Sequence, residues 1–197
     1  MTAPTRWEAA GEGNLEYGRR FGQLVATGAD IEGEARLADA MAPRHARILD
    51  AGAGMGRVGA ALAARGHRVT AIEPNAALVA QARETYPELD IVETDILGFD
   101  TDERFDVIVC VGNVLIFLAE HTERDVLARL RGLLAPGGRI LAGFHPVGGP
   151  TTSRPYRPEE FVADAEAAGL RVDHRFGTYE LRPPSDDYTV WVLSSAL

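Results

Sequence analysis

Short apolar runs alternate with helical patterns along this chain from about residue 46 onwards. A strand, a helix and a second strand in that order form a βαβ unit, which places the two strands parallel in one sheet. We interpret five apolar runs as such strands, at 47–51, 68–73, 90–94, 105–111 and 138–144. The fourth run has an uninterrupted apolar centre, which is typical of a strand buried on both faces. The pattern therefore predicts an α/β protein with a mostly parallel sheet.

Helical patterns lie between and after these strands. A helix is predicted over 122–134, where Thr122 and Asp125 resemble a capping box and the Pro-Gly-Gly at 136–138 ends the helix. A second helix is predicted over 158–168, because proline stands at its first position and glycine follows its end.

The two ends of the chain depart from the βαβ pattern. The runs 171–176 and 188–194 are separated by the polar, proline-containing stretch 183–187 and by no helix, so they are predicted to form an antiparallel hairpin. Two helical patterns, around 14–26 and 31–41, precede the first strand. We therefore expect a single domain over 1–197, in which 1–43 form an N-terminal helical extension and 44–197 form the core.

Composition narrows the possible functions. The formal net charge is −9 and the sequence contains no lysine, since all 20 basic residues are arginine. A nucleic-acid partner is disfavoured by this charge, and chemistry that needs a lysine is excluded.

The first fifteen residues hold no apolar run, and no stretch approaches the roughly 20 apolar residues that span a bilayer. The single cysteine excludes an internal disulfide, and we expect a cytoplasmic protein with no membrane partner. The oligomeric state is not predicted.

Two glycine patterns overlap after the first predicted strand, in ILDAGAGMGRVGAAL. One begins at Gly52 and continues with Gly54 and Gly56. The other begins at Gly54 and ends at Gly59, with the spacing of a dinucleotide-binding loop. The first glycine of such a loop sits at the tight turn directly after the strand, so the pattern beginning at Gly52 fits better.

Acidic residues at the ends of three strands indicate the kind of ligand. Asp50 stands two residues before Gly52, where a carboxylate disfavours a pyrophosphate and favours an ammonium group. Glu73 ends the second strand, where a carboxylate can accept hydrogen bonds from ribose hydroxyls. Asp95 follows the third strand and can accept from an adenine amine, while Ile96 can pack on the purine. Ammonium, ribose and adenine in this order describe S-adenosylmethionine.

The chain resembles the class I S-adenosylmethionine-dependent methyltransferases. The resemblance rests on LDAGAGMGR, AIEPN, ETDIL, CVGNVL and LLAPGGRILAGF, and it runs from about Ile48 to Phe144. It implies a doubly wound, Rossmann-like sheet of seven strands in the order 3-2-1-4-5-7-6, with an antiparallel last strand. It also implies S-adenosyl-L-methionine as cofactor and S-adenosyl-L-homocysteine as product.

The resemblance carries site residues with it. The implied cofactor-binding residues are Asp50, Gly52, Ala53, Gly54 and Gly56 at the methionine part, Glu73, Pro74 and Asn75 at the ribose, Asp95 and Ile96 at the adenine, and Gly112 and Asn113 at the sulfonium. Asn75 is also expected to cap the following helix. Tyr17 or Arg20 of the N-terminal extension is a candidate partner for the methionine carboxylate, since arginine binds a carboxylate through two hydrogen bonds.

Methyl transfer from a sulfonium is an in-line displacement that depends on alignment of the reactants. We expect a small-molecule acceptor, with Asn113 and the loop 145–157 shaping its pocket and His145 a candidate base. The five histidines are scattered, so no metal is predicted. Two alternatives stay open at this point, an NAD-dependent oxidoreductase and a non-catalytic S-adenosylmethionine-binding protein.

Overall fold

The computed structural model describes residues 5–9 and 30–196. The strands in the described residues are β1 (Arg47–Ala51), β2 (Arg68–Glu73), β3 (Asp90–Glu93), β4 (Phe105–Cys110), β5 (Leu134–Phe144), β6 (Leu170–Phe176) and β7 (Thr189–Ser195). The helices are α1 (Arg6–Ala9), α3 (Gly33–Met41), α4 (Arg57–Ala64), α5 (Ala76–Thr85), the short 3₁₀ helix η2 (Val114–Ile116), α6 (Glu123–Gly132) and α7 (Pro158–Ala167). The helix expected around 14–26 lies outside the described residues.

One sheet holds all of these strands, in the order β3-β2-β1-β4-β5-β7-β6. Strands β1 to β5 run parallel to one another, and β7 runs antiparallel to both β5 and β6. The predicted fold class, strand order and terminal hairpin are confirmed.

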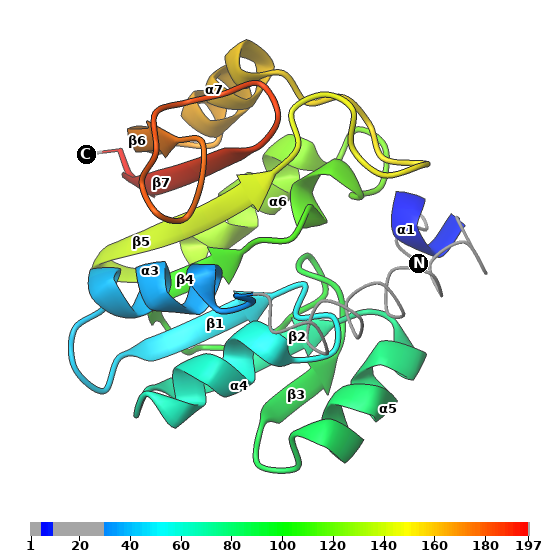
Figure 1. Cartoon of the computed structure of the whole chain (residues 1–197), viewed down its shortest axis with the longest axis vertical. Helices are drawn as coiled ribbons and strands as arrows, with labels where there is room; N and C mark the ends of the chain where they lie inside the picture. Colours follow the sequence, from blue (N-terminus) through cyan, green and yellow to red (C-terminus); the bar gives the residue numbers. More distant parts are fainter. Residues whose placement is uncertain (1–4, 10–29, 197) are drawn as a thin grey trace.

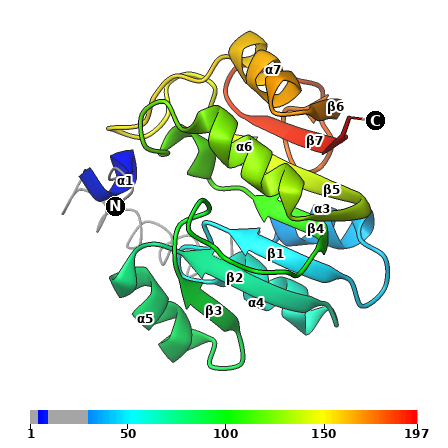
Figure 2. The same ribbon diagram turned by 180° about the vertical axis from the view of Figure 1, so that it is seen from behind.

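Helices cover both faces of the sheet. In Figure 1, α3 and α4 lie in front of the strands, and Figure 2 shows α6 on the opposite face. Ala38 of α3 and Leu62 of α4 are fully buried in a cluster with Ile48 of β1. Leu130 of α6 and Phe161 of α7 are buried in the larger cluster on the other face. Because both faces are covered, the centre of β4 is a continuous apolar run.

This arrangement places the loops that follow β1, β2, β3 and β4 at one edge of the sheet. Parallel strands point their carboxyl ends in one direction, and the strand order reverses direction between β1 and β4. Ligands of doubly wound folds bind at such a switch point. Among the helices of the described segments, none is both long and apolar enough to cross a membrane.

Two local predictions are wrong. Strand β5 begins at Leu134, so the Pro-Gly-Gly at 136–138 lies inside the strand, at an irregularity of the β4–β5 pairing. The capping box is also absent: the hydroxyl of Thr122 makes no hydrogen bond to α6 and donates instead to the carbonyl of Ala119, at 2.8 Å. The reason is the backbone of Thr122 (φ −103°, ψ 1°), which is not the extended conformation that a capping side chain needs.

Candidate functional site

The glycine loop begins directly where β1 ends. Gly52 has φ +81°, and the N–H groups of Gly52 and Ala53 both donate to the carbonyl of Ile72 in β2, at 2.9 and 3.0 Å. Gly56 has φ +80° and immediately precedes α4. The pattern that starts at Gly52 is therefore the one that makes the turn between strand and helix.

Close packing explains why a side chain is excluded at the first glycine. A Cβ at Gly52 would overlap Val114, with Cγ1 of that side chain only 2.8 Å away. At Gly54 the same position meets no atom within 4 Å. The loop therefore packs against η2 at its start and opens into free space at its middle.

Glu73 holds this loop in place. Its Oε2 accepts a hydrogen bond from the N–H of Gly54 at 2.9 Å, and its Oε1 accepts one from the N–H of Asn75 at 3.0 Å. The side chain is buried, with a relative exposure of 5%. Asn75 caps α5, as expected, by accepting from the N–H groups of Ala77 and Leu78.

Asp50 is more deeply buried, with a relative exposure of 2%. Its Oδ2 accepts from the N–H of Gly59 at 2.8 Å, in the first turn of α4. Burial raises the pKa of Asp50 to about 7. A Cβ at Gly59 would lie 3.1 Å from that oxygen, so the last glycine of the second pattern makes room for Asp50.

Asp95 lies in the loop after β3. Its Oδ1 accepts from the N–H of Gly98 at 2.6 Å, so the carboxylate stabilises this turn. Ile96 beside it is buried in the core cluster on the α6 face.

A cavity of about 380 Å³ joins these groups, a volume typical of small-molecule and cofactor sites. The predicted cofactor-binding residues that line it are Asp50, Gly52, Ala53, Gly54, Glu73, Pro74, Asp95, Ile96 and Gly112. The other predicted residues in the described segments, which do not line it, are Gly56, Asn75 and Asn113. Tyr17 and Arg20 lie outside the described residues.

The cavity also has walls that the sequence did not predict. Thr5 and Trp7 line it from the N-terminal segment, and the ring of Trp7 packs edge-on against Phe117, with centroids 5.2 Å apart. The backbone N–H of Arg6 donates to the carbonyl of Phe117 at 2.9 Å. Aromatic residues near a chain end are a weak sequence signal, because nothing local says what they cover.

Glu123 connects this N-terminal segment to a second loop. The residue is buried, with a relative exposure of 7%, and its carboxylate lies 3.7 Å from the guanidinium of Arg6. It also accepts a hydrogen bond from Arg154, at 2.6 Å, in the loop after β5. One buried carboxylate thus contacts two arginines from distant parts of the sequence.

The two predicted catalytic residues, Asn113 and His145, lie next to each other. Neither is among the described residues that line the cavity. Asn113 has φ +78° and is buried, and its Oδ1 accepts from the backbone N–H of His145 at 2.9 Å. The imidazole of His145 packs edge-on against Tyr188, with centroids 4.9 Å apart. Their catalytic roles stay predictions.

Comparisons with known proteins give the family context. A family model described as a methyltransferase domain matches residues 48–138. The structure is similar to a TehB-like SAM-dependent methyltransferase from Corynebacterium glutamicum, with 37% identity and a TM-score of 0.82 over 92% of this chain and 97% of that chain.

More distant structures share the fold. The 1,6-didemethyltoxoflavin-N1-methyltransferase of Burkholderia thailandensis has 24% identity and a TM-score of 0.70 over 100% of this chain and 92% of that chain. The CcbJ methyltransferase of Streptomyces caelestis has 22% identity and a TM-score of 0.75 over 84% of this chain and 90% of that chain. A search of the curated proteins found no match.

Proposed function

The chain belongs to the S-adenosylmethionine-dependent methyltransferases, and on this premise we propose that it methylates a small-molecule acceptor. It is an enzyme whose cofactor is S-adenosyl-L-methionine and whose product is S-adenosyl-L-homocysteine. The alternatives of an NAD-dependent oxidoreductase and of a non-catalytic binding protein are set aside by this membership.

The residues around the cavity fit this cofactor. Glu73 lines the cavity, and its carboxylate is a hydrogen-bond acceptor that suits ribose hydroxyls. Asp95 and Ile96 are proposed to contact the adenine. The open space at Gly54, next to the buried Asp50, is proposed to take the aminoacyl part.

When bound, the cofactor supplies an electrophilic methyl group on a sulfonium, and the protein mainly has to align the acceptor with it. We propose an in-line displacement in which Gly112, at the end of β4, faces the reacting centre. Trp7 and Phe117 would exclude water from that side. Alignment alone can supply roughly 7–11 kcal/mol in well-oriented reactions.

The size of the cavity is the observation that carries the proposal of a small acceptor. A volume of about 380 Å³ with mainly apolar walls accommodates a cofactor and excludes a macromolecule from its interior. The net charge of −9 disfavours a nucleic acid. A distant structural neighbour is a methyltransferase of 1,6-didemethyltoxoflavin, so the same fold is used for a small acceptor.

Two measurements test the proposal. Calorimetry should detect binding of S-adenosylhomocysteine and no binding of NAD, whose binding would contradict the cofactor placement. Incubation with methyl-labelled S-adenosylmethionine and a fractionated cell extract should place the label in the low-molecular-mass fraction. Label found only in protein or nucleic acid would overturn the proposed acceptor class.

A further inference from the structure

A pair of tyrosine hydroxyls lies over the end of β5. Tyr179 follows β6 and Tyr188 directly precedes β7, and their hydroxyl oxygens are 2.8 Å apart. A Cβ added at Gly143 would overlap the hydroxyl of Tyr179 and would lie 2.8 Å from that of Tyr188. The missing side chain at Gly143 therefore leaves the space that the two hydroxyls occupy.

This hydroxyl pair is one strand away from the cofactor cavity. Cys110 of β4 pairs with Ala142 of β5, so Val111 comes beside Gly143. The N–H of Asn113 also donates to the carbonyl of Gly143 at 3.1 Å. Val111 lines the cavity, and neighbouring strands are roughly 4.8 Å apart. The hydroxyl pair therefore lies beside the strand end that carries the cavity wall at Val111.

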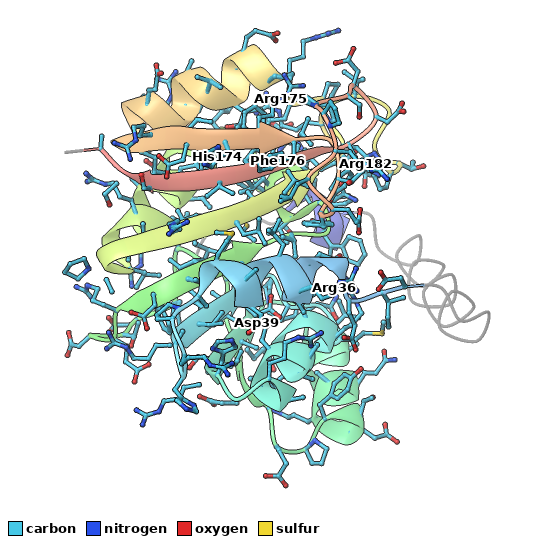
Figure 3. All side chains as sticks on the ribbon, turned by 60° about the vertical axis from the view of Figure 1, so that its left-hand side comes forward. Arg36, Asp39, His174, Arg175, Phe176 and Arg182 are labelled. Atoms are coloured by element: carbon cyan, nitrogen blue, oxygen red, sulfur yellow. The ribbon has the colours of Figure 1, made fainter. Side chains whose placement is uncertain are left out.

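The loop that carries Tyr179 is held against α3. Glu180 lies 3.7 Å from the guanidinium of Arg36, and Figure 3 shows Arg36 on α3 and Arg182 in the loop after β6. Burial raises the pKa of the Tyr179 phenol well above its usual value. The phenol therefore stays protonated near neutral pH and acts as a hydrogen-bonding group. A base that takes a proton from a methyl acceptor has to be another group.

His145 is the candidate for this base. Its Nδ1 lies within hydrogen-bond distance of the carbonyl oxygen of Asp187, and a carbonyl oxygen only accepts, so the proton is assigned to Nδ1. In the neutral ring, Nε2 then carries the lone pair. The ring is oriented by its edge-on contact with Tyr188, and its backbone is held by Asn113.

We propose that Tyr179, Tyr188 and His145 form the polar end of the methyl-acceptor site, and that they bind an uncharged aromatic ring bearing a hydroxyl or ring N–H group. This inference rests on the proposed function. The three rings supply aromatic surfaces, with the two tyrosine centroids 5.8 Å apart. An anionic acceptor is not favoured, because the nearby Arg57 is already paired with Glu34 through hydrogen bonds of 3.0 and 2.7 Å.

The group transfer balances with these residues. The acceptor oxygen or nitrogen forms a bond to the methyl carbon while the bond between that carbon and sulfur breaks. The electron pair of the broken bond stays on sulfur, and the acceptor proton moves to Nε2 of His145. Asn113 is a positioning residue in this scheme, because it contacts only the backbone of His145.

The test uses the full chain with methyl-labelled S-adenosylmethionine and four probes: 4-nitrophenol, 8-hydroxyquinoline, benzimidazole and the saturated cyclohexanol. We expect methylation of at least one aromatic probe and none of cyclohexanol. Tyr179→Phe and Tyr188→Phe should raise KM for that probe at least about tenfold with kcat changed less than about threefold. His145→Gln should lower kcat at least about tenfold with a smaller change in KM.

The matched controls are Tyr86→Phe and His174→Gln. Tyr86 is a half-buried tyrosine after α5, and His174 lies in β6. Both variants should leave KM and kcat unchanged. Affinity for S-adenosylhomocysteine should stay within about twofold in every variant. The inference is overturned if no aromatic probe is methylated, if the tyrosine variants behave like the controls, or if they weaken S-adenosylhomocysteine binding as much as they raise KM. Methylation of other small molecules in the extract would then leave the proposed function standing, whereas label confined to macromolecules would overturn that function itself.

Discussion

Two sides of the cavity are built in different ways. The floor, which we define as the loop 52–56 with Asp50 and Glu73, is held by hydrogen bonds between residues at most 20 positions apart in the chain. The roof, defined as residues 5–7 with Val114 and Phe117, depends on contacts such as that of Arg6 with Leu118, 112 positions away. A local motif therefore specifies the floor, whereas only the folded chain specifies the roof.

The largest effect should come from breaking the contact where floor meets roof. The methyl group of Gly52→Ala would collide with Val114, and φ is +81° at this residue. Together these cost about 2–5 kcal/mol, so calorimetry should find S-adenosylhomocysteine binding weakened at least about 30-fold. Gly132→Ala, at the end of α6 with no atom near the added methyl, is the control. Unchanged binding in Gly52→Ala would contradict the tight floor.

A smaller loss is expected when the floor keeps its shape and loses its charge. Glu73→Gln would present an amide group to the N–H donors of Gly54 and Asn75 and would weaken the bond to ribose. Hydrogen bonds to charged groups contribute about 1.5–3 kcal/mol, so affinity for S-adenosylhomocysteine should fall about 10- to 100-fold. Glu93→Gln, on an exposed residue that pairs with Glu73 in the sheet, should bind normally. Equal affinities for the two variants would remove Glu73 from the site.

The buried acid of the floor makes stability depend on pH. The folded-state pKa of Asp50 is raised from 3.8 to about 7, so the folded protein holds this proton more tightly than the unfolded chain. The contribution to the free energy of unfolding is fully present below pH 4 and is lost as pH rises towards 7, by at most about 1.4 kcal/mol per pH unit. Urea unfolding between pH 4 and 8 should show this loss in the wild type and not in Asp50→Asn. The exposed Asp102→Asn should follow the wild type, and parallel curves for wild type and Asp50→Asn would contradict the shift.

The smallest effect is expected from the roof. Trp7→Ala removes the edge-on contact with Phe117, which is worth about 0.5–1.5 kcal/mol for an aromatic pair. Affinity for S-adenosylhomocysteine should fall about 2- to 10-fold, and Trp7→Phe should recover most of it. Phe176→Ala, which removes a ring stacked on His174 in β6, tests whether any lost aromatic pair has this effect. A loss in Trp7→Ala larger than that in Gly52→Ala would reverse the comparison of roof and floor.

The sequence predicted the fold and the floor for the same physical reason. Strands buried on both faces must be apolar, and a tight turn after β1 requires glycine at Gly52, so both features are visible in the chain itself. Glu73 was predicted because a strand end fixes where its side chain emerges. The cavity includes Gly112 for the same reason, since it stands two residues after the end of β4.

Features that depend on side-chain direction or on distant contacts were harder to predict. Asn113 stands at the expected strand end, but its left-handed backbone turns the amide towards the N–H of His145, and the cavity wall does not include it. Trp7 and Val114 were missed because their partners lie far away in sequence. The start of β5 was misjudged because Pro-Gly-Gly reads as a stop signal, whereas here it is accommodated within a strand.

The position of Glu123 has a consequence for how two distant segments of the chain influence each other. Arg6 and Arg154 contact the same carboxylate, so the free energy of either contact depends on whether the other is made. Thermodynamic reciprocity then applies: the Arg154 contact changes the strength of the Arg6 contact, and the Arg6 contact changes the strength of the Arg154 contact by the same factor. The N-terminal segment and the loop after β5 are thus coupled through one buried carboxylate.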